Sequence, residues 1–202
     1  MKCLILMSGG LDSTVAAQLM KDKGVEFIGL HFSGEPFTGK EPEEKTKKIC
    51  DKFNIPLYVI SFGKHQSEIV NKCKHKYYYV LSKRLMFRIA EKIAQREKCE
   101  YLVTGDNLGQ VGSQTLQNMY VINKAIDMDI LQPNLTFDKQ EIIDLAKKFG
   151  TYELSTGPEM CSILGPKHPA TSAKLKLIEE EEKNLNIGEM INDCLKNIIK
   201  NN

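Results

Sequence analysis

The chain has 202 residues, of which 42% are hydrophobic and 27% are charged. This composition excludes a disordered protein and is typical of a globular protein with a sizeable core. The 28 Lys and Arg nearly balance the 26 Asp and Glu and give a net charge of +2, so bulk charge neither requires nor excludes a nucleic-acid partner. We find no signal-peptide pattern and no apolar run of membrane-spanning length, and we expect a cytoplasmic protein without membrane contact.

Short apolar runs alternate with longer stretches of helical period along most of the chain. Strands are predicted over residues 2–6, 25–31, 57–60, 101–104 and 129–131, and helices over 13–23, 41–53, 76–97, 113–123, 138–149, 172–183 and 187–200. This alternation predicts an α/β fold with a doubly wound parallel sheet and helices on both faces. We assign residues 1–171 to this domain and residues 172–202 to a small helical C-terminal extension.

The six cysteines are scattered along the chain and include no CxxC pair. A disulfide framework is therefore not expected in a reducing compartment, and a structural zinc site lacks its usual paired spacing. We expect most of the thiols to be small core side chains. Cys161 differs from them, because it lies in a polar segment rich in Gly and Pro.

Residues 8–14 read Ser-Gly-Gly-Leu-Asp-Ser-Thr at the turn from the first predicted strand into the first predicted helix. Two glycines let the backbone approach an anion closely, and a helix N-terminus favours negative charge. The carboxylate of Asp12 fits such a site if Mg²⁺ bridges it to phosphate oxygens. The Walker A spacing and its lysine are missing. The segment resembles instead the SGGxDS loop of the ATP pyrophosphatases, which implies an adenine-nucleotide alpha-hydrolase-like fold and cleavage of ATP to AMP and pyrophosphate.

Two further segments indicate which family of ATP pyrophosphatases the chain resembles. Residues 105–118 read GDNLGQVGSQTLQN after the fourth predicted strand, and residues 160–169 contain MCS followed by PKHP. Together with residues 83–90 (KRLMFRIA), they closely resemble the 4-thiouridine synthase (ThiI) family from residue 8 to about residue 182. The resemblance implies that ATP adenylates the O4 of a tRNA uridine, that pyrophosphate leaves, and that a persulfide sulfur replaces the activated oxygen to give 4-thiouridine.

The resemblance also implies roles for individual residues. Asp12 and its loop would hold pyrophosphate and Mg²⁺, Lys139 matches a lysine used for adenylation, and Cys161 matches the active-site cysteine that carries the sulfur. A reactive Cys161 thiolate needs positive charge, which Lys167 and His168 are close enough in sequence to supply. The expected nucleotide-binding residues are Ser8, Gly9, Gly10, Asp12, Ser13, Thr14, His31, Gly105, Gln110 and Gln114. The amide of Asn118 is a further candidate for reading a base edge or ribose.

The sequence departs from the full-length pattern of the family. It shows neither an N-terminal THUMP domain nor a C-terminal rhodanese domain, and Cys73 stands alone where other members have a CxxC pair. We therefore expect tRNA to bind weakly or with the help of a partner subunit or a homodimer. A separate donor protein or a small sulfide source would supply the sulfur. The lysines, arginines and tyrosines of residues 72–88 are either an RNA-binding surface or a solvated helix face.

Two other functions remain open at this point. An amide- or nitrile-forming pyrophosphatase such as a deazaguanine synthase has the same loop, but it typically adds a four-cysteine zinc cluster near the C-terminus. Here only Cys194 follows Cys161. A non-catalytic adenine-nucleotide-binding module would retain the fold for regulation, and the intact Asp12, Lys139 and Cys161 count against it.

Overall fold

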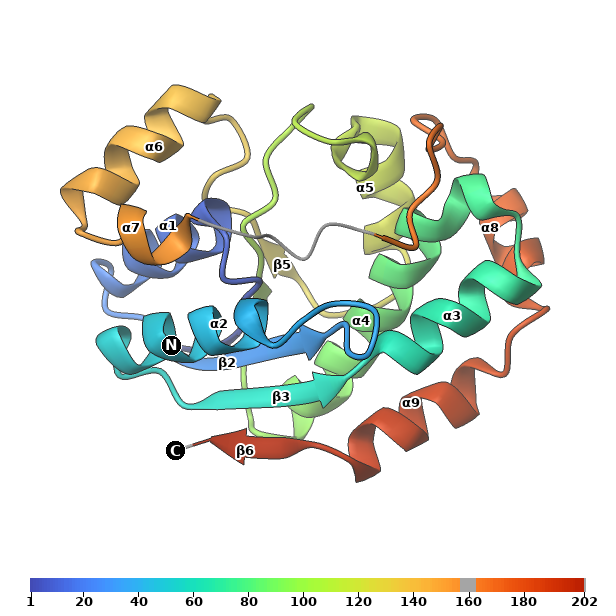
Figure 1. The fold of residues 1–202 in the computed structure, drawn as a ribbon, viewed down its shortest axis with the longest axis horizontal. Coiled ribbons are helices and arrows are strands. Elements are labelled where there is room, and N and C mark those ends of the chain that lie inside the picture. The colour runs from blue at the N-terminus through green and yellow to red at the C-terminus, as the bar shows by residue number, and fades with distance from the viewer. Residues whose placement is uncertain (157–162, 202) are drawn as a thin grey trace.

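The computed structural model describes residues 1–156 and 163–201. Over these residues the chain forms a six-stranded sheet in the order β5-β4-β1-β2-β3-β6 (Figure 1). The strands are β1 (Lys2–Leu6), β2 (Glu26–Ser33), β3 (Leu57–Ser61), β4 (Tyr101–Val103), β5 (Ile130–Leu131) and β6 (Ile199–Asn201). The first five are parallel, and β6 pairs antiparallel with β3 at one edge. The predicted doubly wound parallel sheet is therefore confirmed, with one antiparallel edge strand in addition.

Helices cover both faces of this sheet. They are α1 (Leu11–Lys21), α2 (Glu41–Phe53), α3 (Gly63–Lys72), α4 (Tyr78–Arg96), α5 (Leu116–Asn123), α6 (Lys139–Lys148), α7 (Tyr152–Ser155), α8 (Leu175–Glu182) and α9 (Ile187–Lys196), with 3-10 turns at His75–Tyr77 and Gly112–Gln114. Helices α3, α5, α8 and α9 contact α4, whereas α1, α2, α6 and α7 form a second group. Successive side chains of a strand point to opposite faces. Leu4 of β1 therefore joins the core layer under α4, while Cys3 and Ile5 join the layer under α1 and α2.

Sequence patterns explain where the main helices form. In α4, Leu81, Leu85, Ile89 and Ile93 recur every four residues and are all buried, as an amphipathic helix requires. Helix α3 is missing from the predicted elements, because only Ile69 and Val70 of its ten residues are apolar. No helix in the described ranges is long and apolar enough to cross a membrane.

The C-terminal segment differs from the predicted helical extension. Helix α9 ends at Lys196 rather than at residue 200, and the chain then adds β6 to the sheet. Ile199 of β6 pairs with Val59 of β3. The sequence pattern could not show this, because the pairing depends on a sheet edge supplied by residues far away in the chain. Ile178 of α8 and Met190 of α9 belong to the larger core cluster, so these helices are packed parts of the fold.

Candidate active site

A cleft of about 380 Å³ opens at the carboxyl ends of β1, β2 and β4. The chain runs from β1 to β2 on one side, whereas β4 lies on the other side of β1. This reversal of strand order separates the loops that follow the strands, and ligands of doubly wound sheets bind in the resulting crevice. Ser8, Asp12 and Ser13 line the cleft after β1, and Thr104, Gly105 and Asp106 line it after β4.

The loop between β1 and α1 is shaped by Gly9 and by two hydroxyl groups. Gly9 has a φ of +77°, and a Cβ there would lie 2.7 Å from Thr46 Oγ1, so both conformation and space favour glycine. Ser13 Oγ and Thr14 Oγ1 donate to the Gly10 carbonyl at 3.1 and 2.9 Å. The N-cap residue of α1 is Gly10, which has no side chain to cap the helix. The first amides of α1 are therefore available to bind an anion.

Gly105 brings the loop after β4 into contact with the backbone of the loop between β1 and α1, which we call the phosphate-type loop. A Cβ on Gly105 would lie 2.5 Å from both the Asp12 carbonyl carbon and the Ser13 nitrogen, closer than the 3.0 Å that real Cβ contacts keep. Asn134, which follows β5, donates its side-chain amide to the Asp12 carbonyl at 2.7 Å. The loops after three strands thus converge on the first turn of α1.

Asp106 is a buried carboxylate that accepts three side-chain hydrogen bonds. The donors are Lys83 Nζ of α4, Gln114 Nε2 at 3.2 Å and Thr104 Oγ1 at 2.9 Å. Burial raises the pKa of Asp106, but the Lys83 ammonium and these hydrogen bonds outweigh burial and hold the pKa below its ordinary value. Asp106 is therefore ionised at neutral pH, and it fixes Lys83 and Gln114 against the cleft.

His31 lies at the end of β2 with its ring buried against the loop. Its Nδ1 is 2.8 Å from the Met7 carbonyl oxygen, which assigns the proton to Nδ1 and leaves Nε2 as an acceptor. Burial lowers the pKa of His31 below its ordinary value, and the hydrogen bond with Met7 only partly opposes this shift. Within the described part of the chain, His31 Nε2 and Gln114 Oε1 are buried without a hydrogen-bond partner. Both residues line the cleft, so a ligand there would meet two unsatisfied acceptors.

The remaining wall of the cleft is largely apolar. Leu30 and Phe32 of β2, Phe37 after it, and Met86 and Phe87 of α4 line the cavity. Apolar and aromatic walls with a few converging polar atoms suit a flat heterocyclic ring. The anion-binding amides of α1 and this apolar wall together fit a molecule with a phosphate end and a base end.

The structure brings some of the predicted site residues together and places others elsewhere. The predicted residues that line the cleft are Ser8, Asp12, Ser13, His31, Gly105 and Gln114. Thr14 is buried behind the loop and accepts a hydrogen bond from Ser155 Oγ at 3.1 Å. Gln110 is exposed, and Lys139 is the exposed first residue of α6; neither is among the described residues that line the cleft. Cys161 lies outside the described residues, so its role stays a prediction.

Sequence reasoning missed two residues of the cleft, and it misjudged Asn118, which is not among the described residues that line the cleft. Lys83 was grouped with a basic surface, and Asp106 was not singled out, although a carboxylate directly after a buried strand and a glycine was a usable signal. Asn118 does not read a ligand. Its fully buried side chain donates to the Gly112 and Ala170 carbonyls at 2.6 and 2.7 Å and accepts from the Ala173 amide at 2.8 Å.

Within residues 72–88, which were predicted as either an RNA surface or a solvated helix face, two exposed lysines form ion pairs and two tyrosines are buried. Lys72 pairs with Glu68 at 2.7 Å, and Lys74 pairs with Glu181 at 2.8 Å. Tyr77 and Tyr78 are 7% and 2% exposed. These tyrosines therefore stabilise the core, and they are not available to stack on unpaired bases.

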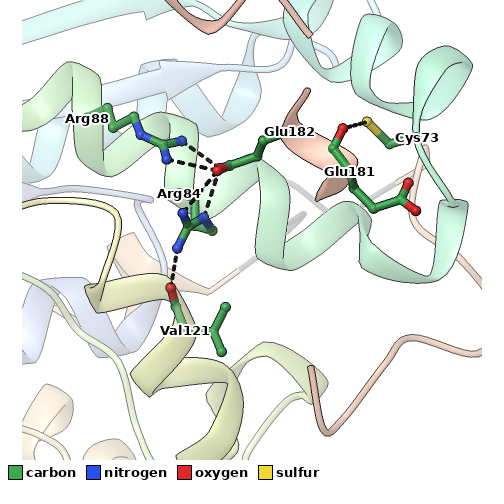
Figure 2. Close-up of polar contacts among 6 residues, drawn as sticks. All are labelled: Cys73, Arg84, Arg88, Val121, Glu181 and Glu182. Atoms are coloured by element: carbon green, nitrogen blue, oxygen red, sulfur yellow. Dashed lines mark hydrogen bonds and ion pairs between the residues drawn. The ribbon is translucent and has the colours of Figure 1, made fainter. Parts of the chain in front are cut away.

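The arginines of the same region hold α8 against α4. Figure 2 shows Arg84 and Arg88 directed at the Glu182 carboxylate, with closest N–O distances of 2.8 and 2.6 Å. Arg84 also donates to the Val121 carbonyl of α5. Burial raises the pKa of Glu182, but its hydrogen bonds from Arg88 and Arg84 outweigh burial and hold the pKa below its ordinary value. Arg84 thus joins α4 to both α8 and α5.

The described thiols are not activated. Burial raises the pKa of Cys73 to about 11, and its Sγ donates to the Glu181 carbonyl at 3.5 Å (Figure 2). Burial likewise raises the pKa values of Cys3, Cys50, Cys99 and Cys194. A raised pKa disfavours the nucleophilic thiolate, so none of the five cysteines in the described ranges has the character of a reactive thiol.

Comparison with known proteins agrees with this geometry. The chain is 41% identical to the probable tRNA sulfurtransferase of Moorella thermoacetica over 202 positions, which cover 96% of this chain and 52% of that protein. It is 40% identical to the probable tRNA sulfurtransferase of Thermoanaerobacter pseudethanolicus, covering 98% of this chain and 54% of that protein. The chain spans about half the length of the curated relatives that it matches.

Solved structures show the same fold. The structure of a 4-thiouridine synthetase–RNA complex with bound ATP superimposes with a TM-score of 0.93 at 33% identity, covering 99% of this chain and 54% of that chain. The NMN synthetase of Francisella tularensis superimposes with a TM-score of 0.63 at 17% identity, covering 96% of this chain and 80% of that chain, which is a likeness of fold alone. Residues 1–187 match the family described as thiamine biosynthesis protein (ThiI), and the chain therefore belongs to this family.

Proposed function

We propose that this chain is the ATP-cleaving part of a cytoplasmic tRNA sulfurtransferase. In this proposal it adenylates a uridine-type carbonyl oxygen and replaces that oxygen with persulfide sulfur carried on Cys161. The observation that carries the proposal is the meeting of the uncapped N-terminus of α1 with Gly105 and the Asp106 network at the point where strand order reverses. Relatives named as probable tRNA sulfurtransferases support the choice of substrate.

ATP fits the cleft in one direction. Its phosphates would lie against the amides of Ser13 and its neighbours, where the helix dipole favours negative charge. Its adenine would lie along the apolar wall, with the 6-amino group donating to His31 Nε2, the buried acceptor that lacks a partner among the described residues. The Lys83 ammonium, held by Asp106, would lie between these two ends and offset phosphate charge.

Mg²⁺ would depend on ATP for most of its ligands. The described residues contain no group of three or more His, Cys, Asp or Glu side chains placed to hold a metal ion. Asp12 lines the cleft in the first turn of α1, where a carboxylate beside phosphates fits only if a cation lies between them. When bound, Mg²⁺ would neutralise the charge on the leaving pyrophosphate.

The chemistry divides into two transfers. The carbonyl oxygen O4 attacks the α-phosphorus of ATP, the bond to the β-phosphate breaks, and pyrophosphate leaves. The terminal sulfur of the Cys161 persulfide then attacks the activated C4, and AMP leaves with the original oxygen. An external thiol finally attacks Cys161 Sγ, so that a disulfide forms there and the thiolated base is released. A second external thiol reduces this disulfide, and a donor protein then transfers the terminal sulfur of its own persulfide to the Cys161 thiol and is left with a thiol. With a small sulfide source, sulfide attacks Cys161 Sγ in the disulfide, the external thiol leaves, and the persulfide is restored.

The sulfur step is tested by Cys161→Ala, with Cys73→Ala as the matched control. Both variants and the wild type are incubated with ATP, Mg²⁺, a persulfide donor and an unmodified tRNA transcript, and AMP and 4-thiouridine are measured. We expect AMP from all three proteins and thiolated product from the wild type and Cys73→Ala only. Full product from Cys161→Ala would overturn the role of this cysteine.

A further inference from the structure

One face beside the cleft combines exposed lysines with exposed apolar side chains. We call it the α5 face; it comprises the exposed side of α5 with its C-cap residue Lys124, and the segment 163–174, which Figure 1 shows rising in orange beside α5. Thr115 Oγ1 donates to the Thr171 carbonyl at 2.6 Å, and Asn118 binds the Ala170 carbonyl and the Ala173 amide. These contacts hold the two segments together as one surface.

The α5 face carries cations and exposed apolar groups, and its segments contain no acids. Residues 107–126 and 163–178, which contain these segments, include no Asp or Glu. Lys124, Lys167 and Lys174 are exposed, and Leu116 and Tyr120 are 66% and 58% exposed. In an otherwise nearly neutral chain, this composition favours a polyanion with apolar or aromatic parts.

The α5 face also borders the cleft. Val111, Ile163 and Leu164 belong to the cleft wall, and a Cβ on Gly112 would lie 3.1 Å from Pro169 Cγ. The rim of the cleft is thus continuous with the α5 face. A large substrate that places one base in the cleft can therefore contact the α5 face at the same time.

We propose that the α5 face holds the RNA substrate of this chain, an inference that rests on the proposed function. Lys124, Lys167 and Lys174 neutralise backbone phosphates, and Tyr120 stacks on an unpaired base. Lys124 already lies over the Tyr120 ring, 5.7 Å from its centroid, so charge and stacking are presented together. The lysines and arginines of residues 72–88 are less suited to bind RNA phosphates. The carboxylates of Glu68, Glu181 and Glu182 already form ion pairs in this region.

RNA fits this face better than a second copy of the chain. A two-fold interface sets the same patch against itself. Here that arrangement would place the lysines of one copy opposite the lysines of the other, and neither segment of the α5 face would supply a carboxylate. Like charges facing each other across an interface disfavour association.

The test compares two variants with the same change of charge. In one, Lys124, Lys167 and Lys174 are replaced by Gln. In the control, Gln replaces three other exposed lysines, which lie before β2 (Lys23), in α4 (Lys92) and before β4 (Lys98). Binding of an unmodified tRNA transcript to the 202-residue chain is measured at several salt concentrations. We expect the first variant to bind at least about tenfold more weakly with a salt slope lower by about 2–3, and the control to stay within about twofold.

Substitutions of Tyr120 provide a second test of the α5 face. Tyr120→Ala should weaken tRNA binding by about fivefold or more, whereas Tyr120→Phe, which keeps the ring, should not. Equal losses in both lysine variants, no loss in either, or no tRNA binding by the wild type at low salt would overturn the proposal. It would also fail if Leu116→Asp dissociated a dimer without changing tRNA affinity. ATP binding measured without RNA tests the proposed function separately, since no substituted residue lines the cleft.

Discussion

The Lys83 ammonium donates a hydrogen bond to the Asp106 carboxylate beside the cleft, and this pair joins α4 to the loop after β4. Lys83→Met would leave Asp106 charged and buried with only Gln114 and Thr104 as donors. We expect the free energy of unfolding to fall by about 3–5 kcal/mol. We also expect ATP affinity, measured by calorimetry, to fall at least about tenfold.

A second substitution separates stability from binding. In Lys83→Met/Asp106→Asn the buried charge is gone, so most of the lost stability should return while ATP affinity stays low. Lys92→Met, an exposed position on the same helix, should change neither quantity. Normal ATP affinity in the double variant would show that Lys83 acts only on the fold.

Gly105→Ala should abolish tight ATP binding. The new Cβ would lie 2.5 Å from the Asp12 and Ser13 backbone, and the phosphate loop would have to move away from the loop after β4. Gly188→Ala is the matched control, since its Cβ would meet only Asn186 Oδ1 at 4.0 Å. The control should leave both melting temperature and ATP affinity unchanged or slightly improved. Unchanged ATP affinity in Gly105→Ala would contradict the proposed contact between the two loops and the nucleotide.

Much of this arrangement could be predicted from the sequence, because it depends on neighbouring residues. The phosphate-type loop, the parallel strands and the apolar face of α4 each follow from local patterns. The Lys83–Asp106 pair could not be predicted in this way, since its members are 23 residues apart and meet only when α4 packs on β4. For the same reason Lys83, Arg84 and Arg88 were taken for a surface cluster: their carboxylate partners lie in distant segments. The edge strand β6 depends on β3, which no local pattern reveals.

His31 should make stability depend on pH. Burial lowers its pKa in the folded chain below the ordinary value of 6.5, so below that value the unfolded chain binds a proton that the folded chain does not. Stability therefore rises with pH through this window and falls on acidification. In His31→Gln the urea midpoint should drop less than in the wild type between about pH 7.5 and about pH 5.5. The pKa of His65 is also lowered by burial, so the stability of His31→Gln will still depend on pH to some extent. A profile identical to that of the wild type would contradict the assignment.

Glu182→Ala should be strongly destabilising. It leaves the buried Arg84 without its carboxylate partner, at a cost of about 3–5 kcal/mol in the free energy of unfolding. Glu180→Ala on the same helix removes only a pair whose side chains are 71% and 68% exposed, and it should cost less than about 0.5 kcal/mol. Denaturant unfolding of the two variants measures the difference. Equal effects would show that the contact between α8 and α4 does not depend on Glu182.

The most direct test of the account is the identity of the products that this chain forms from ATP. With Mg²⁺ and an unmodified tRNA transcript, the proposed site at the N-terminus of α1 predicts AMP and pyrophosphate in equal amounts. Asp12→Asn should lose both. Release of ADP and inorganic phosphate, or tRNA-stimulated AMP formation that survives Asp12→Asn unchanged, would contradict it.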